Sequence, residues 1–347
     1  IHFRSDVADE AAKICEKVRI NPGNYAKDPM EIRTRFLHLI DLCKQYHTAL
    51  RIGVNHGSLS ERIMAQYGDT PEGMVASCME FLRIAVEQQF TNIVLSIKAS
   101  NTRVMVDTVL LLVRTMDAED MHFPLHLGVT EAGEGEDGRI KSAVGIGALL
   151  AEGIGDTIRV SLSEEPEAEL PVARALVDYF TNPDSSRYTG KEVTDPQLKK
   201  LYLAAEAGHQ MLVLHKDWTY PEDIKLQNDI LQAAGVLRYK TEFVSCPGCG
   251  RTMFDLQRTV KEIKQAFDKA EQSEQVSRLS TFSHPPKIAI MGCIVNGPGE
   301  MADADFGYVG AGRGHISLYK GRDCILKNIP QEEAVDALIQ LIKKSSF

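Results

Sequence analysis

Ser245-Cys-Pro-Gly-Cys-Gly250 and Met291-Gly-Cys-Ile-Val-Asn-Gly-Pro-Gly-Glu300 are the two stretches around which this chain is organised. Each follows a short apolar run with the length and composition of a buried strand, so both cysteine loops are predicted to lie at strand ends. Their glycines allow tight turns that point backbone N–H groups at sulfur. Cys246 and Cys249 can hold one metal centre from the first loop, and Cys293 is a third candidate ligand from the second loop.

The fourth ligand position has no nearby cysteine in the sequence. Its candidate is Glu300, which follows a segment rich in turn residues. Iron–sulfur clusters are normally held by four cysteines, so a carboxylate would give one iron a more easily exchanged ligand. The spacing favours an iron–sulfur cluster, and it leaves open a zinc site or a redox dithiol formed by Cys246 and Cys249.

The composition limits the classes of function. The 347 residues carry a formal net charge of -9, which gives no electrostatic reason to approach nucleic acid or an acidic membrane. Of the seven cysteines, three fall in the metal-like loops, and this usage predicts a reducing bacterial cytoplasm. The sequence contains no apolar run long enough to span a bilayer and no recognisable signal peptide.

The first half of the chain alternates strand and helix patterns. Strands are predicted at 17–21, 49–55, 92–98, 125–130 and 157–162. The intervening helical patterns, such as the one that begins at Thr70-Pro71, indicate parallel strands with crossover helices. Beyond a linker-like segment near 181–190, helices are predicted at 195–207 and 224–234, with a short strand at 210–214 between them.

Alternate residues of the predicted strands form a polar face. This face carries Arg19, Asn21, Arg51, Asn55, Lys98, Arg159 and Ser161. Crossover helices must cover the opposite, apolar face, so the polar face points into a barrel interior, where an unpaired guanidinium is costly. Several cations at the carboxyl ends of parallel strands predict a phosphate or diphosphate pocket. The alternative is that each arginine pairs with an acid and only stabilises the barrel.

Glu131 follows the fourth predicted strand directly. Barrel enzymes keep acid–base groups at such positions, although a solvated carboxylate is equally common there. Glu131 is therefore a candidate proton carrier.

The two cysteine motifs resemble the cluster signature of the 4-hydroxy-3-methylbut-2-enyl diphosphate synthase family of the methylerythritol phosphate route to isoprenoids. The strand-end motifs of that family's barrel resemble Arg19-Ile-Asn-Pro-Gly-Asn24, Arg51-Ile-Gly-Val-Asn55, His126-Leu-Gly-Val-Thr-Glu-Ala-Gly133 and Asp156-Thr-Ile-Arg-Val-Ser161. The resemblance implies an α/β fold with a (β/α)8 TIM-type barrel at 1–182 and a reductase-like α/β iron–sulfur domain at 241–347. Between them, 183–240 would be a linker and the remnant of an inserted domain.

The same resemblance implies a [4Fe-4S] cluster on Cys246, Cys249, Cys293 and Glu300. The implied activity is reductive ring opening and dehydration of 2-C-methyl-D-erythritol 2,4-cyclodiphosphate, with two electrons from flavodoxin or ferredoxin and with Glu300 displaced by a substrate oxygen. The seven residues of the polar face would contact the diphosphate, and Glu131 would handle a proton. A homodimer is among the implied assemblies. The alternative function is that of a zinc-stabilised phosphate-ligand-binding protein without redox activity.

The sequence departs from the family pattern in two respects. Only five complete barrel strands are recognisable, and Ile1-His-Phe3 looks like the end of a third-strand motif, so the first strands of the barrel are expected to be missing. The motifs at Asn55-His-Gly-Ser-Leu59 and Ser163-Glu-Glu-Pro-Glu167 resemble the longer, three-domain members, yet the insert is too short for their complete extra domain.

Overall fold

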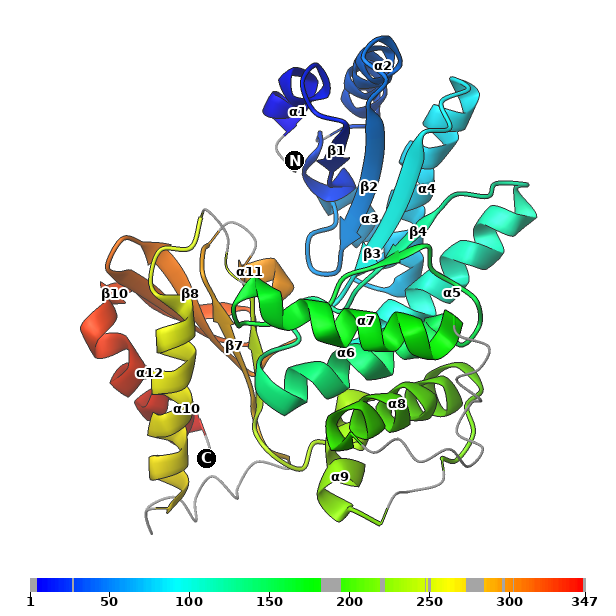
Figure 1. The fold of residues 1–347 in the computed structure, drawn as a ribbon. Helices are drawn as coiled ribbons and strands as arrows, with labels where there is room; N and C mark the ends of the chain where they lie inside the picture. Colours follow the sequence, from blue (N-terminus) through cyan, green and yellow to red (C-terminus); the bar gives the residue numbers. More distant parts are fainter. Residues whose placement is uncertain are drawn as a thin grey trace.

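The computed structural model describes residues 5–26, 28–181, 195–218, 222–246, 248, 251–272, 284–294, 297–301 and 303–345. These residues form two sheets with their covering helices (Figure 1). The first part comprises α1 (Ser5–Ala12), β1 (Lys17–Ile20), η1 (Pro22–Asn24), α2 (Pro29–Gln45), β2 (Ala49–Asn55), α3 (Glu61–Tyr67), α4 (Pro71–Glu87), β3 (Ile93–Lys98), α5 (Thr102–Ala118), β4 (Leu125–Leu127), α6 (Gly135–Leu150), β5 (Thr157–Ile158), η2 (Pro166–Ala168), α7 (Glu169–Thr181), α8 (Pro196–Gly208), η3 (His209–Val213) and α9 (Ile224–Ala233). The second part comprises β6 (Glu242–Ser245), α10 (Leu256–Gln272), β7 (Lys287–Met291), α11 (Gly297–Glu300), β8 (Phe306–Gly312), β9 (His315–Lys320), β10 (Asp323–Pro330) and α12 (Gln331–Ser345).

The first sheet has the order β1-β2-β3-β4-β5, with all neighbouring strands parallel. The five predicted strands and the βα alternation are thereby confirmed. β4 and β5 are shorter than predicted: β5 lies at the edge of the described sheet and pairs only with β4, over two residue positions. The described residues thus contain five strands of the eight that close a complete barrel of this type.

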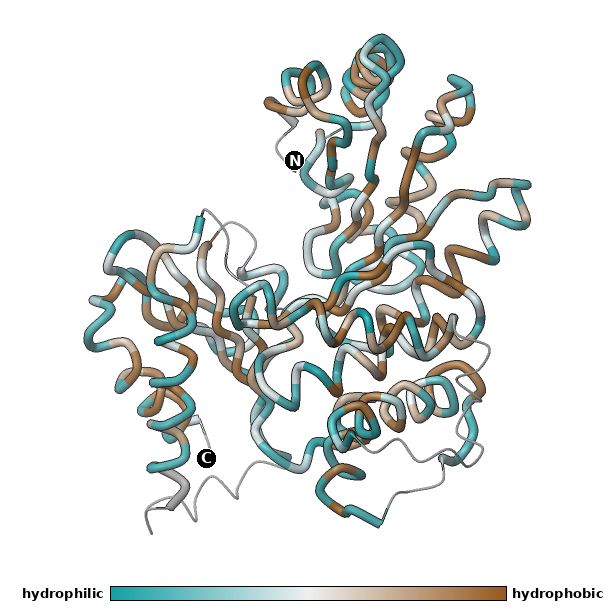
Figure 2. The backbone as a smooth tube through the Cα atoms, viewed as in Figure 1, coloured by the Kyte–Doolittle hydropathy of each residue, from teal (hydrophilic) through white to brown (hydrophobic). Residues whose placement is uncertain are grey.

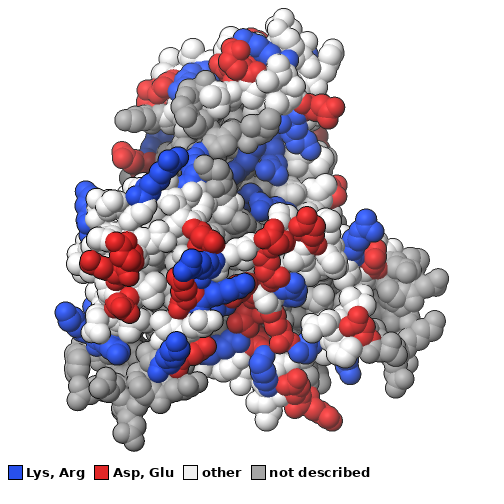
Figure 3. Space-filling view, turned by 60° about the vertical axis from the view of Figure 1, so that its left-hand side comes forward, with Lys and Arg blue, Asp and Glu red and all other residues white. Residues whose placement is uncertain are grey.

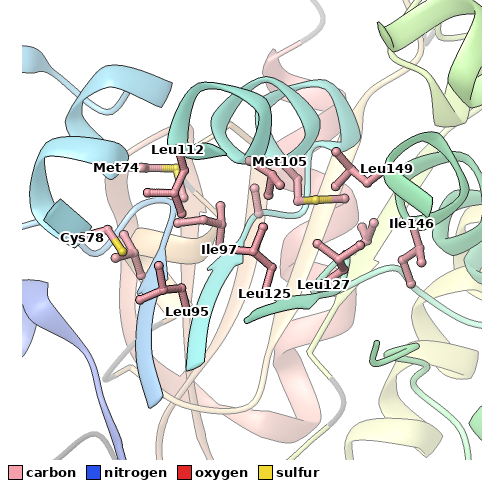
Figure 4. Close-up of a cluster of buried hydrophobic side chains, with 14 of the residues drawn as sticks. Met74, Cys78, Leu95, Ile97, Met105, Leu112, Leu125, Leu127, Ile146 and Leu149 are labelled. Carbon is pink, nitrogen blue, oxygen red and sulfur yellow. The ribbon is translucent and has the colours of Figure 1, made fainter. Parts of the chain in front are cut away.

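The apolar face of this sheet packs against the crossover helices, as the sequence predicts. Leu95 and Ile97 of β3 and Leu127 of β4 are no more than 1% exposed, and Figure 4 shows them beside side chains of α4, α5 and α6. Each fully buried side chain of this size contributes about 1.5–3 kcal/mol. Figure 2 shows hydrophobic segments lying along the helix–sheet contacts and hydrophilic segments on the outer turns. Burial of this face directs the polar face to the other side of the sheet.

Helix α4 illustrates how local sequence sets the element boundaries. Thr70 is its N-cap and accepts a hydrogen bond from the Gly73 N–H at 3.3 Å, and Pro71 occupies the first turn, where its missing N–H costs nothing. The predicted start of this helix is confirmed.

The segment between the two sheets packs as helices on α6. The predicted helices are confirmed as α8 and α9, but the predicted strand at 210–214 is wrong, because this apolar run forms the π-helical turn η3. Gly208 brings the backbone of α8 so close to α6 that an added Cβ would lie 2.1 Å from the Val144 carbonyl oxygen. Leu212 of this run is fully buried, whereas Leu214 is exposed, and a short apolar run does not by itself distinguish a helical turn from a strand.

The second sheet has the order β10-β9-β8-β7-β6. β6, β7 and β8 are parallel, and β8, β9 and β10 form antiparallel pairs. The two strands predicted directly before the cysteine loops are thereby confirmed as β6 and β7. Helices α10 and α12 cover one face, where Val260 and Leu338 are fully buried. No helix in the described ranges is both long and apolar enough to cross a membrane.

Candidate active site

Four basic residues meet at the carboxyl ends of the first sheet, and we call Arg19, Arg51, Lys98 and Arg159 the cationic centre. Strand register places Arg19 beside Arg51, and Asn55 beside Lys98. The charges of the three arginines all act on Lys98, so the four side chains form one electrostatic group. In Figure 3, several basic side chains gather in the middle of the upper half of the face shown, with acidic side chains around them, and acidic and basic side chains are mixed in the lower half.

Arg19 is held in place by the neighbouring strand β2. Its Nη2 donates to Asn55 Oδ1 at 2.7 Å and to the Gly53 carbonyl at 3.2 Å. Gly53 leaves space for the guanidinium, because an added Cβ would lie 2.5 Å from Arg19 Nε. Burial and the neighbouring Arg51 lower the pKa of Arg19 to about 10, although Glu300 acts in the opposite direction. Arg19 is thus a half-buried cation in a setting that an anion would stabilise.

Lys98 has the most strongly perturbed pKa among these cations. Burial, followed by the charges of Arg19, Arg51 and Arg159, lowers its pKa to about 7, and Glu131 opposes the shift. Lys98 is 8% exposed. A bound phosphate group would restore the charged form by compensating the neighbouring cations.

Arg159 and Ser161 follow β5, an edge strand of the described sheet. Arg159 Nε lies 4.0 Å from Glu169 Oε2, and its side chain is 45% exposed. Among the described residues, the hydroxyl of buried Ser161 has no hydrogen-bond partner. A hydroxyl in this situation is free to bind a ligand oxygen.

Asn21 lies at the edge of this arrangement and serves the strand-end loops. Its Oδ1 accepts from the Gly23 N–H at 3.1 Å, and its Nδ2 donates to Ser58 Oγ at 3.1 Å. The carboxamide therefore connects the loop after β1 to the loop after β2, and this second loop continues from Asn55.

Glu131 is buried just beyond β4 in a left-handed backbone conformation, with φ +51°. Burial raises its pKa to about 8, and the nearby Glu300 carboxylate adds to this effect, while Thr130, Lys98 and Lys141 oppose it. This environment favours the protonated form of the side chain. A buried, protonated carboxyl beside a cationic centre is the arrangement expected of a general acid.

The two cysteine loops meet at the ends of β6 and β7. Cys246 Sγ accepts a hydrogen bond from the Gly292 N–H at 3.3 Å, and the Met253 N–H donates to the Gly292 carbonyl at 2.9 Å. Gly292 is required here, since an added Cβ would lie 2.8 Å from Thr252 Oγ1. Cys293 follows at the end of β7 and is half-buried. The predicted hydrogen bond from a loop glycine N–H to a cysteine sulfur is thus present, and it joins Gly292 of the second loop to Cys246 of the first.

The predicted ligand set is only partly visible, because Cys249 lies outside the described residues. Within the described ranges, no three histidine, cysteine or carboxylate side chains are arranged to hold a single metal ion. Burial raises the pKa of Cys246 to about 12, while hydrogen bonds from Gly292 and Gly248 N–H groups act against this rise. A buried sulfur that receives backbone N–H groups is the environment that iron–sulfur thiolates occupy, so the described residues fit such a group.

Glu300 connects the cysteine loops to the cationic centre. It ends helix α11, and its Oε1 accepts a hydrogen bond from Asn55 Nδ2 at 2.9 Å. Asn55 also accepts from Arg19, so one carboxamide joins the arginine to the carboxylate. The predicted cluster ligand and the predicted diphosphate contacts therefore lie in one site within a single chain.

Glycines of the two parts touch beside this hydrogen bond. A Cβ added to Gly57 would lie 1.9 Å from the Gly299 carbonyl oxygen, and a Cβ added to Gly299 would lie 2.1 Å from the Gly57 carbonyl oxygen. Sequence reasoning missed both residues. The sequence does show that Gly57 lies just after a predicted strand and that Gly299 precedes Glu300. Neither pattern indicates that these two glycines contact each other.

Two models of known families match the chain: the GcpE TIM-barrel domain over residues 1–174 and the GcpE protein C-terminal domain over residues 242–344. The chain belongs to the GcpE family. The family resemblance and the predicted combination of a TIM-type barrel with a C-terminal domain are therefore confirmed.

Several relatives of this GcpE-family chain carry the same descriptive name. The 4-hydroxy-3-methylbut-2-en-1-yl diphosphate synthase (flavodoxin) of Parabacteroides distasonis is 41% identical over 529 aligned positions, which cover 99% of this chain and 84% of that protein. The Bacteroides fragilis protein of the same name is 41% identical, with 99% and 82% covered. The 4-hydroxy-3-methylbut-2-en-1-yl diphosphate synthase (ferredoxin) of Prochlorococcus marinus is 43% identical over 359 positions, with 99% and 72% covered. The Parabacteroides alignment is longer than the 347 residues of this chain, so that relative has segments without a counterpart here.

Proposed function

We propose that this chain is an oxidoreductase of isoprenoid biosynthesis. It converts 2-C-methyl-D-erythritol 2,4-cyclodiphosphate to 4-hydroxy-3-methylbut-2-enyl diphosphate by reductive ring opening and dehydration. Membership of the GcpE family and the names of the relatives support this activity. They give no support to a zinc-stabilised binding protein. The conversion takes up two electrons and two protons and releases one water.

The hydrogen bond between Asn55 and Glu300 is the observation that carries the proposal. This hydrogen bond joins the proposed binding site for a doubly phosphorylated ring to the part of the chain that would hold a redox group. In the proposed site, Cys246, Cys249, Cys293 and Glu300 hold a [4Fe-4S] cluster, which supplies the two electrons when it is bound. Reduced flavodoxin or ferredoxin is the proposed electron donor.

The barrel residues bind and orient the substrate. Arg19, Arg51, Lys98 and Arg159 neutralise the diphosphate, because guanidinium and ammonium groups bind phosphate oxygens through charge-assisted hydrogen bonds. Ser161 offers a free hydroxyl and Asn55 a carboxamide, while Asn21 holds the surrounding loops.

Protonated Glu131 is the proposed source of the proton for the departing water. Its pKa of about 8 keeps the carboxyl neutral at neutral pH, and a neutral acid can donate where a carboxylate cannot. In this proposal the substrate-binding domain spans 1–182, the connecting segment 183–240 and the cluster domain 241–347.

Anaerobic reconstitution with iron and sulfide tests the proposal. We expect a brown protein with about four irons per chain, as the cluster type requires. Glu300→Ala should retain the fold and lose turnover, whereas Glu333→Ala, in the exposed first turn of α12, should behave as the unmodified chain. A colourless protein that binds stoichiometric zinc and unfolds with a chelator would overturn the proposal.

A further inference from the structure

A barrel serine contacts the loop that carries the first cysteine. Ser163 lies beyond β5, and its Oγ is 2.5 Å from Ser245 Oγ, 3.2 Å from the Ser245 carbonyl oxygen and 3.5 Å from the Cys246 carbonyl oxygen. Ser163 is 3% exposed and Ser245 is 2% exposed. Ser245 ends β6 and immediately precedes the proposed ligand Cys246. The contact therefore joins a substrate-side loop to the root of a cluster loop.

Hydrogen-bond capacity explains why these two serines are paired. A hydroxyl donates one hydrogen bond and can accept two. Ser245 can donate to Ser163 Oγ while Ser163 donates to the Ser245 carbonyl, so both buried hydroxyls are satisfied by one another and by the backbone. Removing either hydroxyl leaves a buried polar atom of its partner without this hydrogen bond, which is unfavourable in a water-free contact.

The Ser163 backbone is itself held by a neighbouring loop. Its N–H donates to the Gly133 carbonyl at 2.9 Å, in the loop that follows Glu131. A Cβ added to Gly133 would lie 3.2 Å from the Phe243 carbonyl oxygen, so this loop also packs closely against β6. Ser163 thus belongs to a fixed contact between the strand-end loops of the barrel and β6.

On the other side of this contact, two hydrogen bonds hold Cys246. Cys246 N–H donates to the Ile290 carbonyl at 3.4 Å, a long hydrogen bond, and Cys246 Sγ accepts from Gly292. The sheet therefore constrains the Cys246 backbone weakly on one side, and Ser163 constrains it on the other. Groups that orient ligands from outside the ligand set tune both metal affinity and redox potential.

We propose that Ser163, a residue of the substrate-binding barrel, is a positioning residue for the iron–sulfur cluster, acting through Ser245 on the Cys246 backbone. The inference rests on the proposed function, since it requires a cluster on Cys246. It extends the cluster environment beyond the C-terminal domain, so that retention of the cluster depends on the barrel of the same chain.

The test compares the reconstituted chain with Ser163→Ala and with the matched control Ser142→Ala. Ser142 is fully buried in α6, and within the described ranges its hydroxyl has no partner, so this change removes the same atom without a hydrogen bond. Iron release to an added chelator and the reduction potential of the cluster are measured under anaerobic conditions. We expect about 10-fold faster iron release and a shifted potential in Ser163→Ala, and unchanged values in Ser142→Ala.

A second substitution keeps the test decisive if Ser163→Ala does not fold. Ser245→Ala removes the partner hydroxyl and should reproduce the same changes, and the double variant should show little further effect because both changes break one interaction. Equal iron release and equal potential in Ser163→Ala, Ser245→Ala and Ser142→Ala would overturn the inference. Failure of the unmodified chain to assemble any cluster would instead overturn the proposed function.

Discussion

Replacement of Gly57 by alanine should separate the two halves of the active site without unfolding either half. The new Cβ would lie 1.9 Å from the Gly299 carbonyl oxygen, whereas ordinary contacts begin near 3.4 Å. The two backbones must therefore separate by roughly 1.5 Å. Because Glu300 directly follows Gly299, the proposed cluster ligand moves away from the cationic centre by a similar distance.

The expected loss of activity follows from this displacement. A misplacement of about 1 Å can reduce catalysis about 100-fold, so we expect kcat/KM to fall by about that factor in Gly57→Ala. Gly57 also has φ +80°, and an L-residue in this conformation costs about 1–2 kcal/mol. The free energy of unfolding should therefore decrease by at least this amount.

A matched control separates steric displacement from backbone strain. Gly153 has φ +72°, and its added Cβ would meet nothing within 4 Å, so Gly153→Ala carries the strain without the collision. Turnover of the cyclodiphosphate with a chemically reduced donor and the denaturant-induced unfolding of both variants are the measurements. If Gly57→Ala and Gly153→Ala lose stability equally and both retain full turnover, the contact does not set the distance between the two halves.

Two further predictions concern charged side chains. Binding of the cyclodiphosphate should take up a proton near pH 7–8, because the anion raises the pKa of Lys98 from about 7, and affinity should increase as the pH falls through this range. Calorimetry in two buffers with different ionisation heats would measure this uptake, which Lys98→Arg should abolish; equal uptake in both proteins would contradict the assignment. Lys141→Met should lower the free energy of unfolding by up to about 3 kcal/mol, because it leaves the half-buried Glu242 carboxylate without its 2.7 Å partner. Denaturant titration measures this loss, and the double variant Lys141→Met/Glu242→Leu should recover part of it; an unchanged stability of the single variant would show that Lys287 alone holds Glu242.

Ion pairs join the two parts of the chain at their junction. Lys141 of α6 pairs with Glu242 of β6, and Lys264 of α10 pairs with Glu134 at 2.9 Å. Burial raises the pKa of Glu242, but the charges of Lys141 and Lys287 outweigh this effect and lower the pKa to about 2. The Glu242 carboxylate therefore stays charged at neutral pH. The pair contributes stability that is present above the ordinary pKa of 4.5 and is lost as the pH falls toward 2. These ion pairs lie between the first part of the chain and the part that carries the cysteine loops.

Local patterns in the sequence were sufficient for most elements of the fold. Strand β2 alternates Leu50, Ile52 and Val54 with Arg51 and Asn55, and burial of the apolar set leaves the polar set on the opposite face. The strand prediction for 210–214 was wrong because the apolar composition of this run suits a helical turn as well as a strand. Only the packing of Gly208 against α6 decides between them.

The sequence by itself determined the two cysteine loops, the parallel βα order and the polar face that carries the cations, because each depends on residue spacing within a few turns or strands. Only the tertiary structure decided that Glu300 meets Asn55, that Gly57 touches Gly299 and that Ser163 holds Ser245. Asn55 and Glu300 are 245 positions apart, and no local periodicity encodes a contact over that separation. Such contacts form where the surfaces of elements far apart in the sequence fit together, so their geometry depends on the packing of the whole chain.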